Sequence, residues 1–385
     1  MTPQQVLLHL SLCDGFGPVF AQRLLQALPV SAQRQKTLGI SDFNEIYSWT
    51  ASDWISRVHV SEAKAAELVA HLRVTQLLEQ EITQINKVNA QYVTLLDDDY
   101  PHALRSIHAP PAVLYYRGSL TTINNALALA IIGSRAANSY GMRIIKDFVP
   151  ELVEAGFTIV SGGALGADSM AHKETLVSGG KTVAVLGSGL SKLYPRTNLR
   201  LFEDMIENGG AVVSSFPMLM EPLPQHFPAR NRIISGLSRG CIVVQAAEKS
   251  GTRITAQYAL QQGREVFVVP GNFDDPLSAG CHALAREGAT LVTSAAEICA
   301  ELGVAVAAQE VQQKIIPEVA EVSKTVQSAK DVSPGGRIKA ALRTPLSVDE
   351  LAAQLGLDHD LVQQQLWDLQ WQGAVQQDFT GRWHR

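Results

Sequence analysis

The chain has 385 residues, of which 46% are hydrophobic and 18% charged, a composition typical of a globular protein with room for two or three domains. Its formal charge of -5 means that a polyanionic ligand would have to meet a local group of cations. The four cysteines lie far apart without a CxxC pair, which argues against structural zinc. There is no run of about 18 apolar residues to cross a membrane and no signal-peptide pattern, so we expect a cytoplasmic protein.

Residues 1–85 are predicted to form a helical domain. The stretch "LCDGFGPVFAQRLLQAL" places Gly15 and Gly17 around a turn that is followed by a helix-like pattern. This resembles a helix-hairpin-helix of a SAM-like domain, whose turn can offer N–H groups to a DNA phosphate. A tight turn in a small helical bundle explains the same residues. A further helical pattern runs from residue 61 to about 85, and residues 86–125 connect to the next domain through two strand-like runs.

Residues 126–302 alternate between apolar runs and helix-like patterns, which predicts an α/β fold. The expected strands are 127–132, 157–160, 182–186, 211–215, 241–246 and 265–269, with a short one near 290–292. This spacing is typical of a Rossmann-like, doubly wound and mainly parallel sheet. Pro150 lies within the first predicted helix and is expected to kink or shorten it.

The C-terminal part is predicted to be a linker, residues 303–336, followed by a winged-helix domain, residues 337–385. Ser347 and Glu350 form a capping-box pattern before a helix that should stop at Gly356. The next helix carries three aspartates and no lysine or arginine, so we expect a protein-contact or regulatory module rather than a reader of duplex DNA. Trp367 and Trp371, four residues apart, are expected in its core or its contact surface.

Ligands of open parallel sheets bind beyond the carboxyl ends of the strands, so the residues that follow the predicted strands are the candidate site. Three of the loops after the strands are glycine-rich and lie at helix N-termini, where unpaired N–H groups suit anions. Candidate contacts are taken from the turns after the first, second and fifth strands. The candidates in these turns are Gly133, Ser134, Arg135, Ser161, Gly162, Gly163, Lys249, Ser250 and Gly251. The stretch "FPARNRIISGLS" after the fourth strand adds Phe227, Arg230, Asn231 and Arg232.

The cations and N–H donors at this edge suit several phosphates in a row, as in a nucleic-acid backbone. Phe227 could stack on a base, which is characteristic of single-strand binding. Each residue taken alone could equally be a solvated surface charge or a core aromatic. Their clustering at one edge favours the functional interpretation.

Asp168 and His172 lie four residues apart on the helix after the second strand and therefore share a face. No GxSxG elbow frames a serine, and no motif supplies a third metal ligand. We therefore expect Asp168 to brace the glycine loop and His172 to pack beside it. The sequence predicts no catalytic residue, no metal and no cofactor.

The motifs "IIGSR", "SGGALGADSMAH", "VAVLGSGL", "FPARNRIISGLS", "KSGTRITAQYAL", "REVFVVPGN" and "GCHALAREGA" occur in this order. The series resembles that of the DNA-processing protein A family (DprA, also called Smf), over essentially the whole chain. The resemblance implies a non-enzymatic bacterial protein that binds and protects incoming single-stranded DNA in natural transformation. It also implies RecA loading, displacement of single-strand-binding protein, and a homodimer formed through the Rossmann domain.

The resemblance assigns Arg135 to the phosphate backbone and matches Phe227 and its neighbours to the "FPxRNR" element and residues 249–251 to "KSG". Two positions depart from the pattern, because Ser215 and Gln245 stand where the family commonly has carboxylates. An alternative is a Rossmann-type nucleotide or nucleoside-phosphate hydrolase, which would need a catalytic carboxylate such as Glu248, Asp274 or Asp275. A duplex-binding regulator acting through the winged helix is a third possibility.

Overall fold

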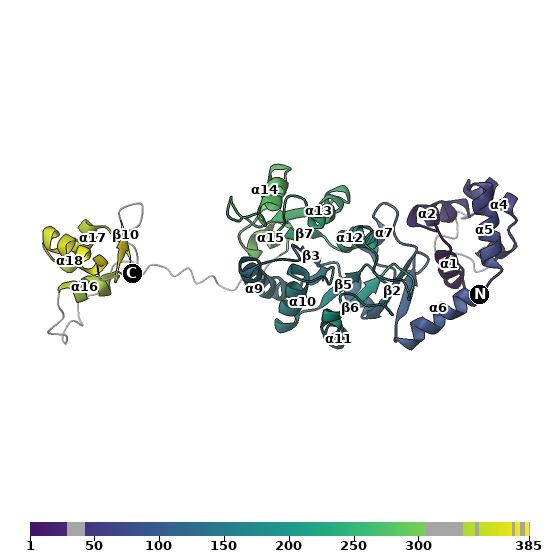
Figure 1. The fold of residues 1–385 in the computed structure, drawn as a ribbon, viewed down its shortest axis with the longest axis horizontal. Helices are drawn as coiled ribbons and strands as arrows, with labels where there is room; N and C mark the ends of the chain where they lie inside the picture. Colours follow the sequence, from purple (N-terminus) through teal and green to yellow (C-terminus); the bar gives the residue numbers. More distant parts are fainter. Residues whose placement is uncertain (29–42, 305–333, 343–345, 372–373, 378–381, 385) are drawn as a thin grey trace. The chain divides into compact units, whose positions relative to one another are not determined.

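The computed structural model describes residues 1–28, 43–304, 334–342, 346–371, 374–377 and 382–384 (Figure 1). The chain divides into two compact units, Met1–Gln309 and Glu310–Arg385. Most of the predicted linker, residues 305–333, lies outside the described residues.

The first unit is built on a nine-stranded sheet with the order β1-β2-β6-β5-β4-β3-β7-β8-β9. The strands are β1 (Gln91–Thr94), β2 (Val113–Gly118), β3 (Ala128–Ile132), β4 (Thr158–Ser161), β5 (Thr182–Leu186), β6 (Ala211–Ser214), β7 (Gly240–Val243), β8 (Glu265–Val268) and β9 (Thr290–Leu291). Strands β3 to β9 are parallel to one another, whereas β2 pairs antiparallel with β6 and β1 pairs antiparallel with β2. The predicted mainly parallel sheet is confirmed, with every expected strand present.

The strand order reverses beside β3. From β3 the chain proceeds through β4, β5 and β6 in one direction, and it then returns to place β7, β8 and β9 on the other side of β3. The loops that follow β3 and β7 therefore diverge and leave a crevice at the carboxyl edge of the sheet.

Helices cover both faces of the sheet because alternate residues of each strand point to opposite sides. In β3, Leu129 and Ile131 pack into the core on the side of α9 (Ser139–Glu154), α10 (Ala167–Val177) and α15 (Ala295–Glu301). Ala130 and Ile132 pack into the opposite core with α12 (His226–Gly236), α13 (Gly251–Gln261) and α14 (Ala279–Arg286). Figure 1 shows α12 and α13 on one side of the sheet and α10 on the other, with α11 (Leu199–Glu207) below β6.

Pro150 lies inside α9, which continues to Glu154. Of the two expected effects of this proline, a kink or a shortened helix, the shortening is wrong, and the kink stays a prediction. Phe148, Val149 and Leu152 are all buried around it. Their packing outweighs the loss of one backbone hydrogen bond.

The N-terminal residues form α1 (Pro3–Ser11), α2 (Pro18–Ala27), η1 (Glu45–Ser48), α4 (Ala51–Val58), α5 (Glu62–Leu72) and α6 (Gln76–Lys87). The pattern over residues 61–85 is therefore two helices rather than one. Trp54 is fully buried in the core of this region. The carboxylate of Glu81 on α6 accepts a hydrogen bond from the Met218 N–H at 2.8 Å, which ties α6 to the loop after β6.

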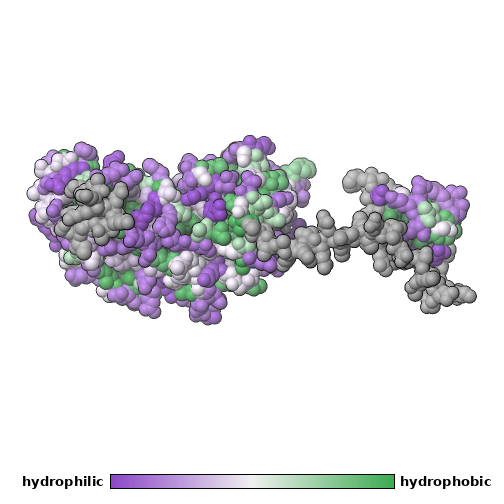
Figure 2. All heavy atoms as spheres, turned by 180° about the vertical axis from the view of Figure 1, so that it is seen from behind, coloured by the Kyte–Doolittle hydropathy of each residue, from purple (hydrophilic) through white to green (hydrophobic). Residues whose placement is uncertain are grey.

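Short helices α7 (His102–Arg105) and α8 (Leu120–Ile123) flank β2. On the face of the first unit seen in Figure 2, hydrophilic residues are interspersed with smaller apolar patches. Among the described residues, none of the helices combines the length and the hydropathy needed to span a membrane.

The second unit contains α16 (Pro334–Ala341), α17 (Val348–Leu355), α18 (His359–Trp371) and the antiparallel pair β10 (Gln376–Gln377) and β11 (Trp383–His384). The predicted capping box is confirmed, since Ser347 and Glu350 bond reciprocally at the start of α17. Gly356 ends this helix with a φ of 62°, as expected. The side chains of Trp367 and Trp371 lie outside the described residues.

Candidate nucleic-acid interface

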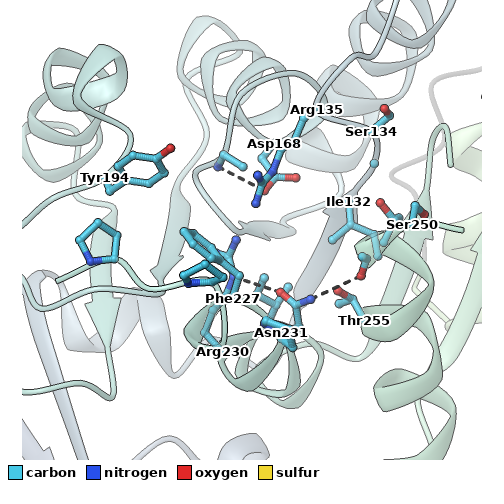
Figure 3. A pocket seen from close by; sticks show the side chains of 18 residues that line it. Ile132, Ser134, Arg135, Asp168, Tyr194, Phe227, Arg230, Asn231, Ser250 and Thr255 are labelled. Atoms are coloured by element: carbon cyan, nitrogen blue, oxygen red, sulfur yellow. Dashed lines mark hydrogen bonds between the residues drawn. The ribbon is translucent and has the colours of Figure 1, made fainter. Parts of the chain in front are cut away.

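A cavity of about 760 Å³ opens at the carboxyl edge of the sheet, where the strand order reverses (Figure 3). Its lining comes from the turn after β3, the loop before α10, the loop around Tyr194, the start of α12 and the start of α13. The residues are Ile132, Gly133, Ser134, Arg135, Ala164, Asp168, Tyr194, Pro222, Pro224, Phe227, Pro228, Arg230, Asn231, Ile234, Ser250, Gly251, Thr252 and Thr255. The crevice therefore combines a polar wall with an apolar wall of proline and aromatic rings.

The turn after β3 is held by backbone contacts on two sides. The Ser134 N–H donates to the Gln245 carbonyl at 2.8 Å, and the Ala167 N–H donates to the Ser134 carbonyl at 3.1 Å. A Cβ added at Gly133 would lie 2.6 Å from the Cβ of Ala167, so the close approach of α10 requires glycine here. These contacts fix the backbone of the turn and leave Arg135 exposed at the cavity.

Arg135, Phe227 and Tyr194 form an aromatic and cationic wall. The Arg135 guanidinium lies over the Phe227 ring, with its carbon 5.3 Å from the ring centroid. The Tyr194 ring meets the Phe227 ring edge-on, at 5.9 Å between centroids and 61° between planes. Tyr194 is 46% exposed, so this wall offers rings and a guanidinium to a ligand in the cavity.

Arg230 was expected on an exposed cationic rim, and this expectation is wrong. Its side chain is only 4% exposed and lies in the floor of the cavity. It donates to the carbonyl of Gly162 at 2.5 Å and to the carbonyl of Val185. Burial lowers the pKa of Arg230 to about 10, while the nearby Asp168 carboxylate raises it. Arg230 therefore connects the ends of β4 and β5 to α12.

The other residues of the "RNR" element point in different directions. Arg232 donates to the Ala109 carbonyl at 2.6 Å and does not line the cavity. Positions 230 and 232 are two apart, so their side chains lie on opposite faces of α12. Asn231 accepts from Arg230 Nε at 3.0 Å and lies 3.5 Å from the Gly251 carbonyl, at the start of α13.

The "KSG" residues open α13. Ser250 and Gly251 line the cavity, whereas Lys249 is exposed outside its lining. The Ser250 hydroxyl oxygen is buried without a hydrogen-bond partner. The first N–H groups of a helix have no partner within the helix, so this end of α13 can receive an anion.

Ser161, Gly162 and Gly163, in the glycine loop after β4, are buried rather than exposed at the edge of the sheet, and their contact with DNA stays a prediction. The Ser161 hydroxyl donates to the Ile131 carbonyl at 2.6 Å. A Cβ added at Gly162 would lie 2.4 Å from the Arg230 guanidinium. The absence of a side chain at Gly162 thus leaves room for the buried arginine.

Asp168 and His172 both lie beneath the surface. Asp168 is 7% exposed, and its carboxylate accepts from the Ala164 N–H at 3.3 Å. Burial raises the pKa of Asp168, although Arg230 acts in the opposite direction. His172 Nδ1 lies 2.6 Å from the hydroxyl of Thr182, which itself donates to the Ile159 carbonyl. Because the Thr182 hydroxyl donates to Ile159, His172 Nδ1 donates to Thr182. Among the described residues, His172 Nε2 has no hydrogen-bond partner.

His172 is expected to make the protein less stable in acid. Burial lowers its folded-state pKa to about 3 from an ordinary 6.5, so between these values the unfolded chain binds the extra proton. Stability should fall with decreasing pH by up to about 1.4 kcal/mol per pH unit. The free energy of unfolding, measured with urea between pH 7 and pH 5, should change less steeply with pH in His172→Gln than in the wild type. The exposed His108→Gln is the control, and an unchanged slope for His172→Gln would contradict this role.

The structure adds cavity residues that the sequence did not single out as site residues, notably Tyr194, Thr252, Thr255 and three prolines. The "YP" pair after the third strand was a visible signal for Tyr194. Gln245 is buried and pairs with Asn138, accepting from its N–H and donating to its side-chain oxygen, both at 3.1 Å. This neutral amide orients Asn138, which caps α9.

Carboxylates are scarce at the cavity. Asp168 is the acidic residue of the lining, and Glu248, Asp274 and Asp275 lie outside it. Within the described residues, no three His, Cys, Asp or Glu side chains gather as potential metal ligands. The fold and the cavity thus define a Rossmann-like, doubly wound protein with a crevice at its switch point, lined by an arginine, aromatic rings and the start of α13.

The chain belongs to the DNA recombination-mediator protein A family, whose model matches residues 91–303. It is similar to the DNA processing protein DprA of Streptococcus pneumoniae, with 45% identity over 208 residues, 54% of this chain and 73% of that protein. The crystal structure of DNA processing protein A from Streptococcus pneumoniae matches with a TM-score of 0.65 and 34% identity, over 78% of this chain and 98% of that one. The family resemblance drawn from the motifs is confirmed.

A second solved structure is that of DNA processing protein A from Helicobacter pylori, described for its unique single-stranded DNA binding mode. It matches with a TM-score of 0.50 and 30% identity, over 55% of this chain and 95% of that one.

Proposed function

We propose that this chain binds single-stranded DNA, without sequence preference, in the cavity at the switch point. The observation that carries the proposal is the wall formed by Arg135 and Phe227 opposite the start of α13. An exposed guanidinium and free helix N–H groups suit phosphates, and the rings suit unstacked bases. The single-stranded DNA binding of the Helicobacter pylori relative supports the same interpretation.

In this proposal the phosphate contacts come from Arg135, the N–H groups of Gly133 and Gly251, and Lys249 outside the cavity. The Ser134 N–H is already used by the Gln245 carbonyl, so Ser134 would offer its hydroxyl instead. Phe227 contacts a base, and Asn231 joins the two sides of the site. Arg230 and Asp168 support the floor. No catalytic residue, metal or cofactor is assigned.

The wider role that we propose is a cytoplasmic one in natural transformation. The protein would protect incoming DNA and promote RecA loading, with displacement of single-strand-binding protein, as a homodimer formed through the Rossmann domain. The helical N-terminus would act as a SAM-like domain and the second unit as a winged helix, joined to the first by a linker. A nucleotide hydrolase is less well supported, because the candidate carboxylates Glu248, Asp274 and Asp275 lie outside the cavity lining.

Titration with labelled oligonucleotides tests the proposal. Single strands should bind more tightly than duplexes of the same length and with little dependence on sequence. Each phosphate contact should add roughly 0.7 to the magnitude of the slope of log K against log salt concentration. Equal affinity for both forms, or a signal independent of salt, would count against the proposal.

Removal of the second unit should leave the single-strand affinity within a few-fold, because the proposed site lies in Met1–Gln309. The described start of α18 carries Asp360 and no lysine or arginine to attract phosphates. The measurement is the affinity of residues 1–309 against that of the full chain, together with self-association and RecA binding. A large loss of DNA binding, or strong duplex binding by residues 310–385, would contradict this assignment.

A further inference from the structure

The Phe227 ring is partly buried, and one of its faces is occupied in the free protein. The Arg135 guanidinium lies over one face, and Tyr194 meets the ring edge-on. A Cβ added at Gly187 would lie 3.3 Å from Phe227 Cδ1, so backbone also lies close to the ring. A base cannot stack on the face that the guanidinium occupies until the guanidinium has moved.

Arg135 is weakly held in this position. Within the described part of the chain, its guanidinium has no ion pair and no hydrogen bond, and the contact with Phe227 is its ring partner. It also lies close enough to the buried cation of Arg230 to lower the pKa of that residue. An exposed cation–π contact corresponds to only about a two- to fivefold change in an equilibrium constant. A phosphate oxygen offers the guanidinium a stronger, charge-assisted hydrogen bond.

We propose that Arg135 acts as a lid on Phe227 and that a DNA phosphate draws it off the ring, so that phosphate capture uncovers the platform for a base. The inference rests on the proposed function of the same cavity. It predicts an order of events in which the backbone is gripped first and a base stacks afterwards. A polyanion without bases would therefore open the lid without filling the space beneath it.

The test compares two ligands of equal length, oligo-dT and an abasic oligonucleotide with the same phosphates and no bases. Phe227→Leu removes the ring but keeps an apolar side chain. It should weaken oligo-dT binding by about five- to 150-fold, since base stacking is lost. It should strengthen abasic binding by about two- to fivefold, because Arg135 no longer has to leave a ring. These opposite signs distinguish a lid from a fixed stack.

The Arg135→Ala background provides the matched control. There Phe227→Leu should leave abasic binding unchanged, because no guanidinium covers the ring. In this background Phe227→Leu should weaken oligo-dT binding more than it does in the wild type, by the same two- to fivefold. The reason is that a base can stack on Phe227 without first displacing a guanidinium. Phe227→Met removes the ring with a different apolar side chain and should give the same result. Thermal unfolding of each variant shows whether a change in affinity comes from altered folding.

If folded Phe227→Leu protein binds the abasic oligonucleotide more weakly, the ring holds Arg135 in its binding position, and the lid proposal is wrong. Unchanged abasic binding would also contradict the proposal, because the ring would then have no effect on Arg135. Failure of the wild type to bind either ligand would instead overturn the proposed function. The upfield shift that a ring imposes on the Arg135 Nε–H signal offers a second, affinity-independent measurement. The abasic oligonucleotide should abolish this shift, and its persistence in the complex would contradict the proposal.

Discussion

Arg135→Ala should weaken the binding of single-stranded DNA by about ten- to 100-fold and leave the fold intact. A charge-assisted hydrogen bond to a phosphate contributes about 1.5–3 kcal/mol. The side chain is exposed and is held only by its contact with the Phe227 ring, so its removal costs little folding free energy. The variant should also lower the magnitude of the salt slope by roughly 0.7.

Arg200→Ala is the matched control, because it removes the same charge from α11, where the arginine side chain is 82% exposed and outside the cavity lining. Affinities measured at two salt concentrations, with thermal unfolding curves for both variants, separate a phosphate contact from a general effect of charge. Equal losses of affinity in the two variants would show that Arg135 contributes only to the overall field.

Arg230→Met, unlike Arg135→Ala, should greatly lower the free energy of unfolding. Arg230 is a buried cation that acts electrostatically on the buried Asp168 carboxylate without a direct ion pair between the two. Leaving a buried charge uncompensated typically costs about 3–5 kcal/mol. Here the change also leaves the carbonyls of Gly162 and Val185 without their donor. Thermal unfolding should show a fall in Tm of roughly 5–10 °C.

The double variant Arg230→Met with Asp168→Asn should recover part of this loss, because the uncompensated buried carboxylate is then neutral while its oxygen still accepts from Ala164. Arg200→Met serves as the exposed control and should unfold near the wild-type temperature. Unchanged stability of Arg230→Met combined with lost DNA binding would mean that Arg230 is a ligand contact after all.

The seven strands between residues 126 and 302 could be predicted because each is a short apolar run bounded by turn residues. A strand of a parallel sheet is buried on both faces, so its residues are apolar regardless of which strands it pairs with. The capping box of Ser347 and Glu350 and the Gly356 stop were predictable for a similar reason, since all their hydrogen bonds are local. The antiparallel pairing of β2 with β6, which adds β1 and β2 to the sheet, could not be predicted. The paired residues are more than 90 positions apart, so no local pattern indicates the pairing.

The site residues divide in the same way. The sequence by itself determined that Arg135 follows a buried strand at a tight turn, and that a glycine-rich loop and a "KSG" helix start lie at the same edge of the sheet. It could not determine which side chains reach the cavity. Arg230, Asn231 and Arg232 are consecutive, yet only the packing of α12 places one in the floor, one beside α13 and one against Ala109. Only the tertiary structure assigned these roles, because the direction of a helical side chain depends on how the whole helix is rotated against its sheet.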